Sequence, residues 1–502
     1  METPKRFSNM REHSSGRTLD ISHYIFPGIQ PHIYSWTRIY GKNFVYWHGP
    51  KAKLVVSEPE LIRELMNHRD ISNSRGEVEE FMKRILGDGI LTSEGAKWLK
   101  LRKLSNHAFH AESLRNMIPA MVESVENMLK GWRHYDGKEI EVTEELRNLA
   151  SEVISKTAFG SSYLEGKQIF ETFQKFMIIV GRNAYKIRLP VISHIFKSND
   201  DRESERLEKG VRDSIIKISN KREKLQITGG EPESSGDFLG LLLKAYHDPN
   251  LKNKISIEEI IDECKAFYIA GHSPISDFLS WTVLFLSIHT DWQDKARKEV
   301  LEIFGDNIPN AEGISRLKTM SMIINESLRL YPPVIFTERK AEKETRIRKL
   351  ILPANTDIQI PILAIHHDPK IWGENAHLFK PERFQEGIAG ATNSNSAAVL
   401  PFGRGARACV GLNFTYIEAK ITLSIILQHY AFTLSPTYMH SPVHIMSLTP
   451  QTGIQLCKKA IRRWACGNRR GEMVEATEAG YPGIPCRELK GNGSSNYRKR
   501  GK

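Results

Sequence analysis

Hydrophobic and polar positions follow a helical period over much of this chain and a period of two only in short segments. Residues 43–57 alternate as two short strands around the turn at Gly49-Pro50. A helix with proline in its first turn is predicted for Pro59–Met66. Residues 112–250 predict helices joined by short polar loops, of which the glycine-rich residues 229–236 are typical of a mobile surface loop.

The longest apolar stretch with helical spacing covers residues 256–288. Ser256 and Glu259 have the spacing of a capping box, and further acidic residues occupy the first turns, as a helix N-terminus prefers. We therefore expect one long helix with a kink at Pro274, because proline removes a backbone hydrogen bond. A further helix is predicted for Leu412–His429.

Composition places the chain among large globular proteins. Its 502 residues are 40% hydrophobic and 26% charged, which is ample for a large core. No run of eighteen apolar residues occurs, which argues against a transmembrane helix and a secretory signal. The cysteines show no paired spacing, so we expect a reducing compartment; they are Cys264, Cys409, Cys457, Cys466 and Cys486.

The positive charge is concentrated at the C-terminal end. The net charge is +12, and residues 458–502 hold twelve Lys/Arg against four Glu, which leaves about +4 for the rest. This distribution argues against a nucleic-acid-binding surface on the body of the protein. Because residues 458–502 are poor in apolar residues, we expect a disordered tail, with a membrane-surface or nucleic-acid contact as the alternative.

The most informative chemistry lies at residues 402–411, Phe-Gly-Arg-Gly-Ala-Arg-Ala-Cys-Val-Gly. Cys409 follows Arg407 by two residues and precedes the helix predicted from residue 412. Glycines suit a tight turn whose backbone N–H groups approach whatever the sulfur binds. An arginine and a helix N-terminus lower the pKa of a thiol, so Cys409 is a candidate metal ligand at neutral pH. The alternative is a structural cysteine in a tight loop.

The full pattern Phe-x-x-Gly-x-Arg-x-Cys-x-Gly resembles the haem-binding loop of the cytochrome P-450 superfamily, and its two later glycines are Gly405 and Gly411. The resemblance implies that Cys409 is the axial thiolate ligand of haem iron. It also implies that Phe402 packs beside the sulfur and that Arg407 binds a haem propionate.

The resemblance extends over residues 21–456, chiefly to plant members of the clan that includes gibberellin, cytokinin and triterpenoid oxidases. It implies a mainly α fold with small β-sheets (α+β), in which b-type haem lies between the long helix and the cysteine loop. It divides the chain into residues 1–20, a haem domain over 21–457 and the tail over 458–502. Because residues 1–20 are polar, we expect that the family's membrane anchor is absent through truncation.

Other positions match the family's contacts with haem. Ser93 is a candidate helix cap, and Trp98 and Arg102 follow on one face of the helix. By resemblance, Trp98 and Arg102 hold a haem propionate, and Arg339 is a further propionate contact.

Two segments are candidates for substrate contact. Apolar residues in and before the glycine-rich loop 87–95 either face a substrate, as in the family, or are packed in the core; they are Ile85, Leu86, Ile90 and Leu91. Ile335 and Phe336, in a strand-like segment over 334–337, are expected by resemblance to point toward the substrate.

A buried ion-pair network is implied further along the chain. Glu326 and Arg329 are one helical turn apart and precede Leu-Tyr-Pro-Pro, as in the family's Glu-x-x-Arg element. By resemblance, Arg383 completes a structural triad that holds the haem-loop region in place. We do not interpret residues 366–368, His-His-Asp, as a metal site, because adjacent side chains diverge and no third ligand lies nearby in the sequence.

The middle of the long helix departs from the family pattern. The family has Ala/Gly-Gly-x-Asp/Glu-Thr-Thr/Ser, whereas residues 270–275 are Ala-Gly-His-Ser-Pro-Ile. In the family the acid and the threonine relay protons to iron-bound dioxygen, and proline and isoleucine have no side-chain proton to offer. Substitutes for the relay are His272, Ser273 and Ser276, so His272, Ser273 and Pro274 mark a degenerate oxygen-activation site. We expect haem binding to be retained and coupled oxygenation to be impaired.

The resemblance implies a monooxygenase that inserts one oxygen atom of O2 into a C–H bond of a small apolar substrate, terpenoid-like or hormone-like. Its cofactors would be haem b and O2, with electrons from NADPH through a flavoprotein reductase that docks near Cys409. It further implies a monomer on the cytosolic face of the endoplasmic reticulum membrane, with no nucleic-acid partner.

Two alternatives remain open. The altered helix also permits a haem enzyme that rearranges a peroxidised substrate and needs no proton relay. Against this, the loop at Cys409 lacks the insertion of plant hydroperoxide-rearranging relatives. The missing anchor, the altered helix and the basic tail together permit a catalytically impaired or decayed haem-binding copy.

Overall fold

The computed structural model describes residues 21–461, except residues 50, 77, 79, 136, 162, 184–197, 228–235 and 349. The chain divides at Ile461 into two units, of which the first contains all described residues. The predicted polar start over 1–20 and most of the predicted loop over 229–236 lie outside the described residues. Among the helices that are described, none is both long and apolar enough to cross a membrane.

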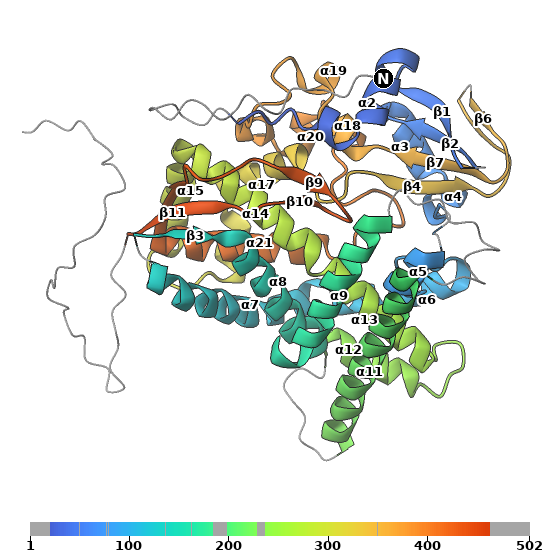
Figure 1. Cartoon of the computed structure of the whole chain (residues 1–502), viewed down its shortest axis with the longest axis horizontal. Helices are drawn as coiled ribbons and strands as arrows, with labels where there is room; N and C mark the ends of the chain where they lie inside the picture. The colour runs from blue at the N-terminus through green and yellow to red at the C-terminus, as the bar shows by residue number, and fades with distance from the viewer. Residues whose placement is uncertain are drawn as a thin grey trace, which may run out of the picture. The chain divides into compact units, whose positions relative to one another are not determined.

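Helices form most of the described chain, with small β-sheets beside them (Figure 1), so the prediction of a mainly α fold with small sheets is confirmed. The helix predicted for Leu412–His429 has those bounds, and Pro59–Asn67 extends the prediction by one residue. The helices that carry the N-terminal half are α1 Phe26–Ile29, α2 Pro31–Tyr40, α3 Pro59–Asn67, α4 Arg69–Asn73, α5 Glu80–Leu86, α6 Gly95–Ala108, α7 Ala111–Trp132, α8 Val142–Phe159, α9 Tyr163–Asn183, α11 Asn199–Ile227 and α12 Phe238–Tyr246.

The remaining helices begin with the central pair and end with the helix after the cysteine loop. Their bounds are α13 Ile257–Ala270, α14 Ser273–Ile288, α15 Thr290–Phe304, α16 Ala311–Arg316, α17 Lys318–Leu330, α18 Ile362–His366, α19 Pro369–Trp372, α20 Gly387–Ala391 and α21 Leu412–His429. Short 3-10 helices lie at Arg133–Tyr135, Pro381–Phe384 and Ser396–Ala398.

The strands form four small sheets. The largest has the order β1-β2-β7-β4, in which β2 pairs parallel to β7 and the other pairs are antiparallel. A second sheet has the order β3-β11-β8, and β9-β10 and β5-β6 are two-stranded. The bounds are β1 Asn43–His48, β2 Lys51–Val56, β3 Glu139–Glu141, β4 Thr337–Ala341, β5 Thr345–Ile347, β6 Leu350–Leu352, β7 Thr356–Ile360, β8 Tyr430–Leu434, β9 Pro442–His444, β10 Leu448–Pro450 and β11 Gln455–Ala460.

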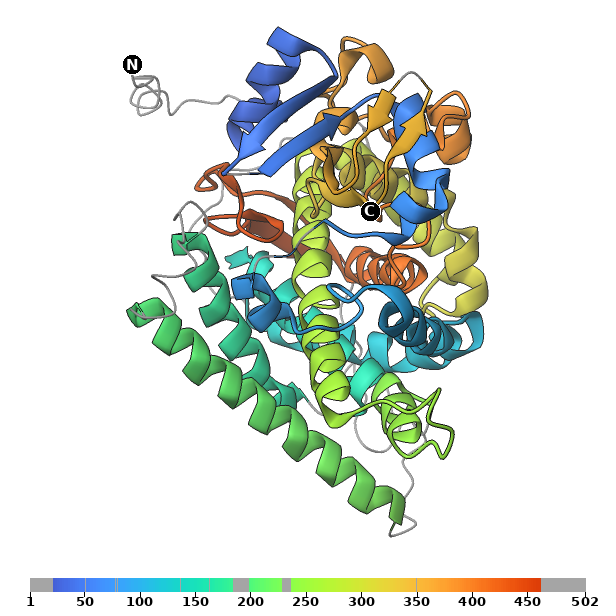
Figure 2. The ribbon, with the colours of Figure 1, turned by 90° about the vertical axis from the view of Figure 1, so that its right-hand side faces the viewer.

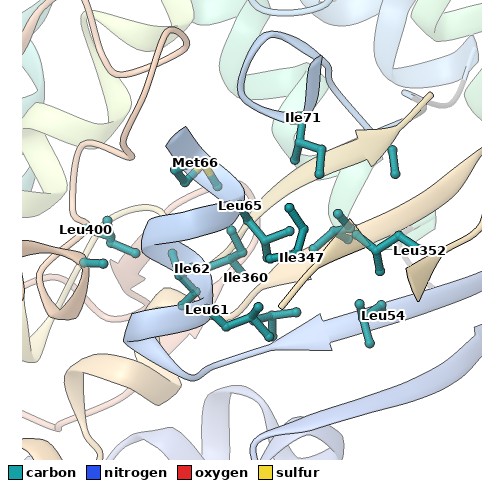
Figure 3. Close-up of a cluster of buried hydrophobic side chains, with 14 of the residues drawn as sticks. Leu54, Leu61, Ile62, Leu65, Met66, Ile71, Ile347, Leu352, Ile360 and Leu400 are labelled. Atoms are coloured by element: carbon teal, nitrogen blue, oxygen red, sulfur yellow. The ribbon is translucent and has the colours of Figure 1, made fainter. Parts of the chain in front are cut away.

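The two strands predicted around Gly49-Pro50 are confirmed as the β1–β2 hairpin. The strand predicted from residue 334 begins only at Thr337, and Ile335 before it is buried. The alternating inward positions of this sheet pack on α3 and on Leu400, just before the cysteine loop (Figure 3). This apolar cluster therefore connects the sheet to the loop that carries Cys409.

The stretch predicted as one long helix is two helices, α13 and α14, separated at Gly271 and His272. Figure 2 shows the pair in yellow-green, running through the helical part of the unit. Pro274 lies in the first turn of α14, where a backbone N–H has no partner within a helix in any case. The expectation of one continuous helix with a kink is thus wrong, because the chain begins a new helix at the proline. The predicted capping box of Ser256 and Glu259 is confirmed.

The C-terminal strand β11 runs three residues beyond the expected start of the tail at residue 458. Lys458 is buried, and its ammonium group lies 4.6 Å from the centre of the Tyr430 ring. A cation over an aromatic face stabilises a charge that composition alone would place in water. Residues 458–460 are therefore a correction to the predicted tail, and residues 462–502 lie outside the described chain.

Candidate active site

The loop around Cys409 is held by its own backbone and by α4. The Cys409 N–H donates to the carbonyl of Phe402 at 2.9 Å, and the Ala406 N–H donates to Ser72 Oγ at 3.0 Å. Gly405 has a φ of +80°, and a Cβ there would lie 2.3 Å from the same Ser72 oxygen. The turn therefore requires glycine at 405, both for its backbone conformation and for the close approach of α4.

The Cys409 thiol does not have the lowered pKa that the sequence suggested. Burial raises the pKa of the Cys409 thiol, and the Gly411 N–H and the Arg102 charge oppose this effect only in part. The expectation is therefore wrong for the protein by itself, since surrounding protein atoms disfavour the thiolate more than these groups favour it. The Cys409 side chain nevertheless keeps accessible surface, and so does Ala270 at the end of α13, where residues 263–269 before it are buried. The ring of Phe402 lies 5.7 Å from that of Tyr416.

Three arginines from separate elements have no carboxylate within ion-pair distance among the described residues. Arg102 Nη1 donates to the Ala408 carbonyl at 2.6 Å, and Arg407 donates to the carbonyls of Asn73 and Ser93 at 2.6 and 2.8 Å. Those two arginines and the buried Arg339 form no ion pair within the part of the chain that the structure describes. The site thus has an excess of positive charge.

Burial and electrostatic repulsion between arginines lower the pKa values of Arg339 and Arg407. Burial, followed by the charges of Arg407 and Arg75, lowers the pKa of Arg339 to about 10. Burial lowers the pKa of Arg407 to about 10 as well, and the positive charges of Arg75 and Arg102 act in the same direction. Arg339 Nε is buried and without a hydrogen-bond partner among the described residues. Groups arranged in this way favour an anionic ligand, because it relieves both the repulsion and the missing hydrogen bond.

Trp98 contributes by stacking. The Arg407 guanidinium lies 4.5 Å from the centre of the buried Trp98 ring, so the helix residue orients the loop arginine. Ser93 is not the helix cap that the sequence suggested. The cap position of α6 is Glu94, and the buried Ser93 hydroxyl has no partner among the described residues, while its carbonyl accepts the Arg407 bond. Ser93 thus holds Arg407 in place through its carbonyl and does not cap α6.

The helix break at residues 271–272 decides which side chains are available there. The Ser273 hydroxyl lies 3.1 Å from Ser447 Oγ, and Ser276 Oγ donates to the Ser273 carbonyl at 2.9 Å. Burial lowers the pKa of His272 to about 3, and the charge of Arg147 acts in the same direction. His272 is therefore neutral at physiological pH and is a poor proton carrier. Ser276 is also a poor carrier, because its proton is bound to the backbone.

The glycine-rich loop after α5 lies against α13. A Cβ at Gly87 would come within 2.8 Å of the Asp262 Cα, and one at Gly89 would lie 2.6 Å from Glu263 Oε1. The same Glu263 oxygen accepts the Ile90 N–H, and Glu263 Oε2 is buried without a partner among the described residues. Gly87 and Gly89 therefore permit the close contact with α13, and Glu263 fixes the glycine-rich loop through the Ile90 N–H. The sequence suggested Glu263 only as part of an acidic helix start.

Of the apolar residues that were candidates for substrate contact, Ile85, Leu86 and Ile90 are buried and Leu91 is half-buried. Phe336 is half-buried, with its ring 6.2 Å from that of His444 on β9. Packing thus accounts for most of these positions, and Leu91 and Phe336 retain accessible surface.

Glu263 gives a testable pH dependence. Burial raises the pKa of Glu263 from 4.5 to about 8. Between these two pH values, folded Glu263 keeps a proton that the unfolded chain releases. The contribution of Glu263 to stability is therefore most favourable below pH 4.5 and falls as pH rises toward 8. Glu263→Gln keeps the acceptor for Ile90 and removes the charge. At pH 9 it is expected to raise the free energy of unfolding by on the order of 5 kcal/mol relative to the wild type.

Denaturant unfolding from pH 5 to 9, with exchange of the Ile90 amide, measures this effect. Glu259→Gln is the matched control on the same helix. The pKa of Glu259 is lowered by its bonds to Ser256 and Lys100, which outweigh its partial burial. Its titration therefore lies below the measured range. Equal slopes for wild type and Glu263→Gln between pH 5 and 8 would contradict the assignment.

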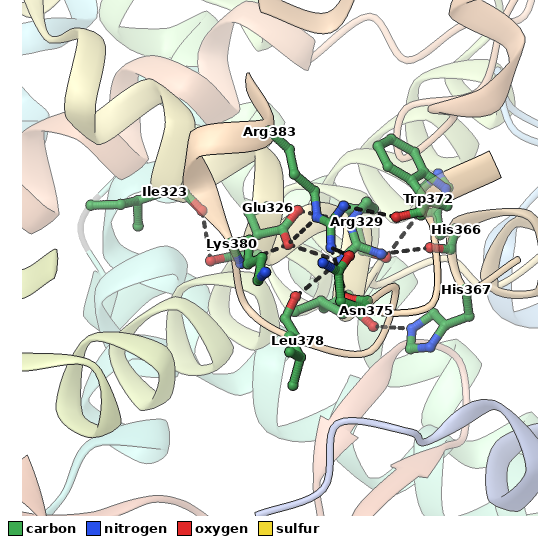
Figure 4. A network of polar contacts seen from close by, with 12 residues as sticks. Ile323, Glu326, Arg329, His366, His367, Trp372, Asn375, Leu378, Lys380 and Arg383 are labelled. Carbon is green, nitrogen blue, oxygen red and sulfur yellow. Dashed lines mark hydrogen bonds and ion pairs between the residues drawn. The ribbon is translucent and has the colours of Figure 1, made fainter. Parts of the chain in front are cut away.

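The structure brings Glu326, Arg329 and Arg383 together (Figure 4). Arg329 donates to both oxygens of Glu326, at 2.7 and 2.8 Å, and both side chains are fully buried. Arg383 Nε lies 3.5 Å from Glu326 Oε1, which is an ion pair without a hydrogen bond. Its other nitrogens bind the carbonyls of Trp372 and Asn375 at 2.8 and 2.7 Å.

The two adjacent histidines after α17 are part of this network. His366 Nδ1 lies 3.1 Å from the Arg329 carbonyl, and the Leu400 N–H donates to His366 Nε2 at 2.9 Å. His367 Nε2 binds the Leu330 carbonyl at 2.8 Å. Within the described residues no group of three potential ligands could hold a metal ion. His366 thus connects the ion-pair network to the segment before Phe402, a role that the sequence did not indicate.

A model of the cytochrome P450 family matches residues 27–458. The chain belongs to the cytochrome P450 family. Cytochrome P450 CYP749A22 of Panax ginseng is 55% identical over 454 residues, which are 90% of this chain and 86% of that protein. The 11-oxo-beta-amyrin 30-oxidase of Glycyrrhiza uralensis is 41% identical over 433 residues, 82% of this chain and 80% of that protein.

Among solved structures, retinoic acid bound cyanobacterial CYP120A1 shares the cytochrome P450 fold. Its TM-score is 0.75 at 22% identity, with 88% of this chain and 96% of that chain covered. The resemblance drawn from the sequence is therefore confirmed for the family and for the fold. Proteins of this family are haem-dependent monooxygenases that use O2.

The residues present fit a haem. An accessible thiol at Cys409 would supply a soft ligand for iron, and Arg102, Arg339 and Arg407 would supply the positive charge that two propionates require. The buried Arg339 Nε, which has no hydrogen-bond partner among the described residues, is one atom that a propionate would satisfy. Metal coordination also displaces the thiol proton, which overcomes the raised pKa of Cys409.

Proposed function

We propose that this protein is a haem-thiolate monooxygenase that hydroxylates a triterpenoid-like substrate with electrons from NADPH. Per turnover, substrate R–H, O2, NADPH and one proton give R–OH, water and NADP+. The observation that carries the proposal is the accessible Cys409 thiol near arginines that form no ion pair with a carboxylate among the described residues. Two relatives with 41% and 37% identity named 11-oxo-beta-amyrin 30-oxidase support the substrate class.

Each part of the site has a role in this proposal. Cys409 would be the axial ligand, with Phe402 beside it, and Arg102, Arg339 and Arg407 would hold the propionates. When bound, haem supplies the O2-activating chemistry, which thiolate ligation favours. Glu263 fixes the loop that includes Leu91, and this positions apolar surface for the substrate.

We further propose haem b as the prosthetic group and a flavoprotein reductase as the electron donor that docks on the Cys409 side. The proposed location is the cytosolic face of the endoplasmic reticulum membrane, with the protein a monomer. These proposals rest on membership of the family and on its plant members.

The test combines purified protein, a plant cytochrome reductase, NADPH and a panel of β-amyrin-type triterpenoids under ¹⁸O2. Hydroxylated product with one ¹⁸O atom is the expected result. Product formed only with an organic hydroperoxide would favour the peroxide-rearranging alternative instead. Absence of product, from a folded protein that binds haem, would favour an impaired copy.

We propose that coupling of NADPH use to oxygenation is lower in this chain than the family's acid–threonine pair would give. Pro274→Thr adds a hydroxyl at the first turn of α14, where the family has threonine. It is expected to raise the fraction of NADPH electrons recovered as product severalfold, because a general acid path gains a donor. Pro274→Ala removes the proline without adding a hydroxyl and is the matched control. An equal rise in both variants would contradict the role of the hydroxyl.

A further inference from the structure

A chain of three buried or half-buried polar groups crosses from the helix break to a carboxyl group. Ser273 Oγ lies 3.1 Å from Ser447 Oγ, and Ser447 Oγ donates to Asp277 Oδ2. Asp277 and Ser447 are 2% and 4% exposed, whereas Ser273 is half-buried. The carboxyl group thus lies at the buried end of the chain, and the accessible end is the position where the family has its acid.

The surrounding structure holds this chain in place. Ser447 lies in the turn between β9 and β10, and β10 packs beside α14 (Figure 1). Trp281, one helical turn after Asp277 on the same face, donates to the Leu448 carbonyl at 2.7 Å. The Leu448 N–H in turn donates to the carbonyl of Pro333 at 2.9 Å. The two hydrogen bonds of Leu448 therefore hold the adjacent Ser447 between Ser273 and Asp277 of α14.

We propose that Asp277 is a proton-holding residue that acts through Ser447 and Ser273, in place of the acid–threonine pair that positions 273 and 274 lack. This inference rests on the proposed function. The sequence also suggested Ser276 and His272 as substitutes. The Ser276 hydroxyl donates to a backbone carbonyl, and His272 is neutral.

The proton movement is a concerted shift along the chain. The Asp277 carboxyl proton passes to Ser447 Oγ, the proton of Ser447 passes to Ser273 Oγ, and the proton of Ser273 leaves the chain. The reduction of O2 to water consumes it, with electrons from NADPH. A proton from bulk solvent, the one proton of the net reaction, then returns to the carboxylate. Hydroxyl groups suit such a shift, because each is both a donor and an acceptor and its hydrogen can rotate.

The electrostatics of Asp277 support this role. Burial raises the pKa of Asp277 to about 6, against hydrogen bonds from Ser447 and Thr449, the charge of Arg147 on α8 and a hydrogen bond from Ser273. Both protonation states are therefore accessible near neutral pH, as a proton donor requires. Arg147 is the charged side chain from a neighbouring helix that acts on it, and β10 contributes the Thr449 hydroxyl.

The experiment compares Asp277→Asn and Ser447→Ala with Ser280→Ala in the full chain with haem, reductase and NADPH. Ser280 is buried on the same helix, but its hydroxyl bonds only within the helix, to the Ser276 carbonyl at 2.7 Å. Asp277→Asn and Ser447→Ala are expected to lower the fraction of NADPH electrons recovered as water or product by on the order of tenfold, with a matching rise in peroxide. Ser280→Ala is expected to match the wild type.

Infrared spectroscopy provides a readout that does not depend on turnover. A carboxyl C=O band that titrates near pH 6 is expected in the wild type and in Ser280→Ala, shifted in Ser447→Ala and absent in Asp277→Asn. The shift in Ser447→Ala reports the contact between Ser447 and the carboxyl group. The coupling measurement then shows whether this contact carries the proton.

The outcomes separate this inference from the proposed function. If the wild type lacks the red-shifted CO absorption of a haem thiolate, the proposed function fails. With that absorption intact, wild-type coupling in Asp277→Asn and Ser447→Ala, or an equal loss in Ser280→Ala, overturns the inference. If Asp277→Asn does not fold, Ser447→Ala decides, because it interrupts the chain and leaves the carboxyl group in place.

Discussion

Serine in place of Cys409 is expected to abolish the strongly red-shifted Soret band of the reduced, CO-bound protein and to remove NADPH-dependent oxygenation. An alcohol does not ionise to an anionic ligand as a thiol does, so iron loses the electron donation that favours O–O cleavage. Loss of a supporting group around a metal typically costs 10–100-fold in affinity or activity, so loss of the ligand itself should cost on the order of a hundredfold or more. Absorption spectra and turnover rates of the purified variant measure both effects.

Cys457→Ser is the control for this substitution. Cys457 is half-buried on β11, in the sheet with β3 and β8, and its replacement is expected to leave the spectrum unchanged. A red-shifted band that persists in Cys409→Ser would show that another group ligates the iron. Loss of the band with unchanged haem content would agree with the assignment of Cys409.

Alanine in place of Glu326 is expected to lower the free energy of unfolding by about 3–5 kcal/mol, because a buried arginine is left without its counter-charge. Arg329 is fully buried and donates to both carboxylate oxygens, and the Lys380 N–H donates to Glu326 Oε1 at 2.9 Å. The substitution also disturbs Arg383, whose ion pair with Glu326 would be lost. Denaturant unfolding of the variant measures the loss.

A second effect follows from the path through His366. The Arg329 carbonyl binds His366, which accepts the Leu400 N–H next to the cysteine loop. Glu326→Ala is therefore expected to reduce the haem content of the purified protein as well as its stability. The matched control is Glu203→Ala, which removes an exposed Glu–Arg pair with the same three-residue spacing and should leave the unfolding midpoint unchanged. Equal behaviour of the two variants would contradict a special role for the buried network.

Local sequence patterns predicted the elements whose packing agrees with their own periodicity. The hairpin over residues 43–56 and the helix Leu412–His429 are examples, because turn residues mark the first and a long apolar run of helical length marks the second. The pattern over residues 256–288 gave the right capping box but missed the break, since apolar spacing continues across Gly271 and His272. A proline at the second position of a helix and a proline inside one look the same in a sequence.

By itself the sequence determined the family and predicted Cys409 and the arginines as the haem contacts, because these depend on residue type and spacing. Tertiary structure alone decided the raised pKa of Cys409, the buried Arg339 Nε without a hydrogen-bond partner among the described residues, and the contacts of Ser447 with Ser273 and Asp277. These properties depend on burial and on which distant segments meet. Residues 277 and 447 are 170 positions apart, and only the packing of β10 on α14 places a hydroxyl against the carboxyl group.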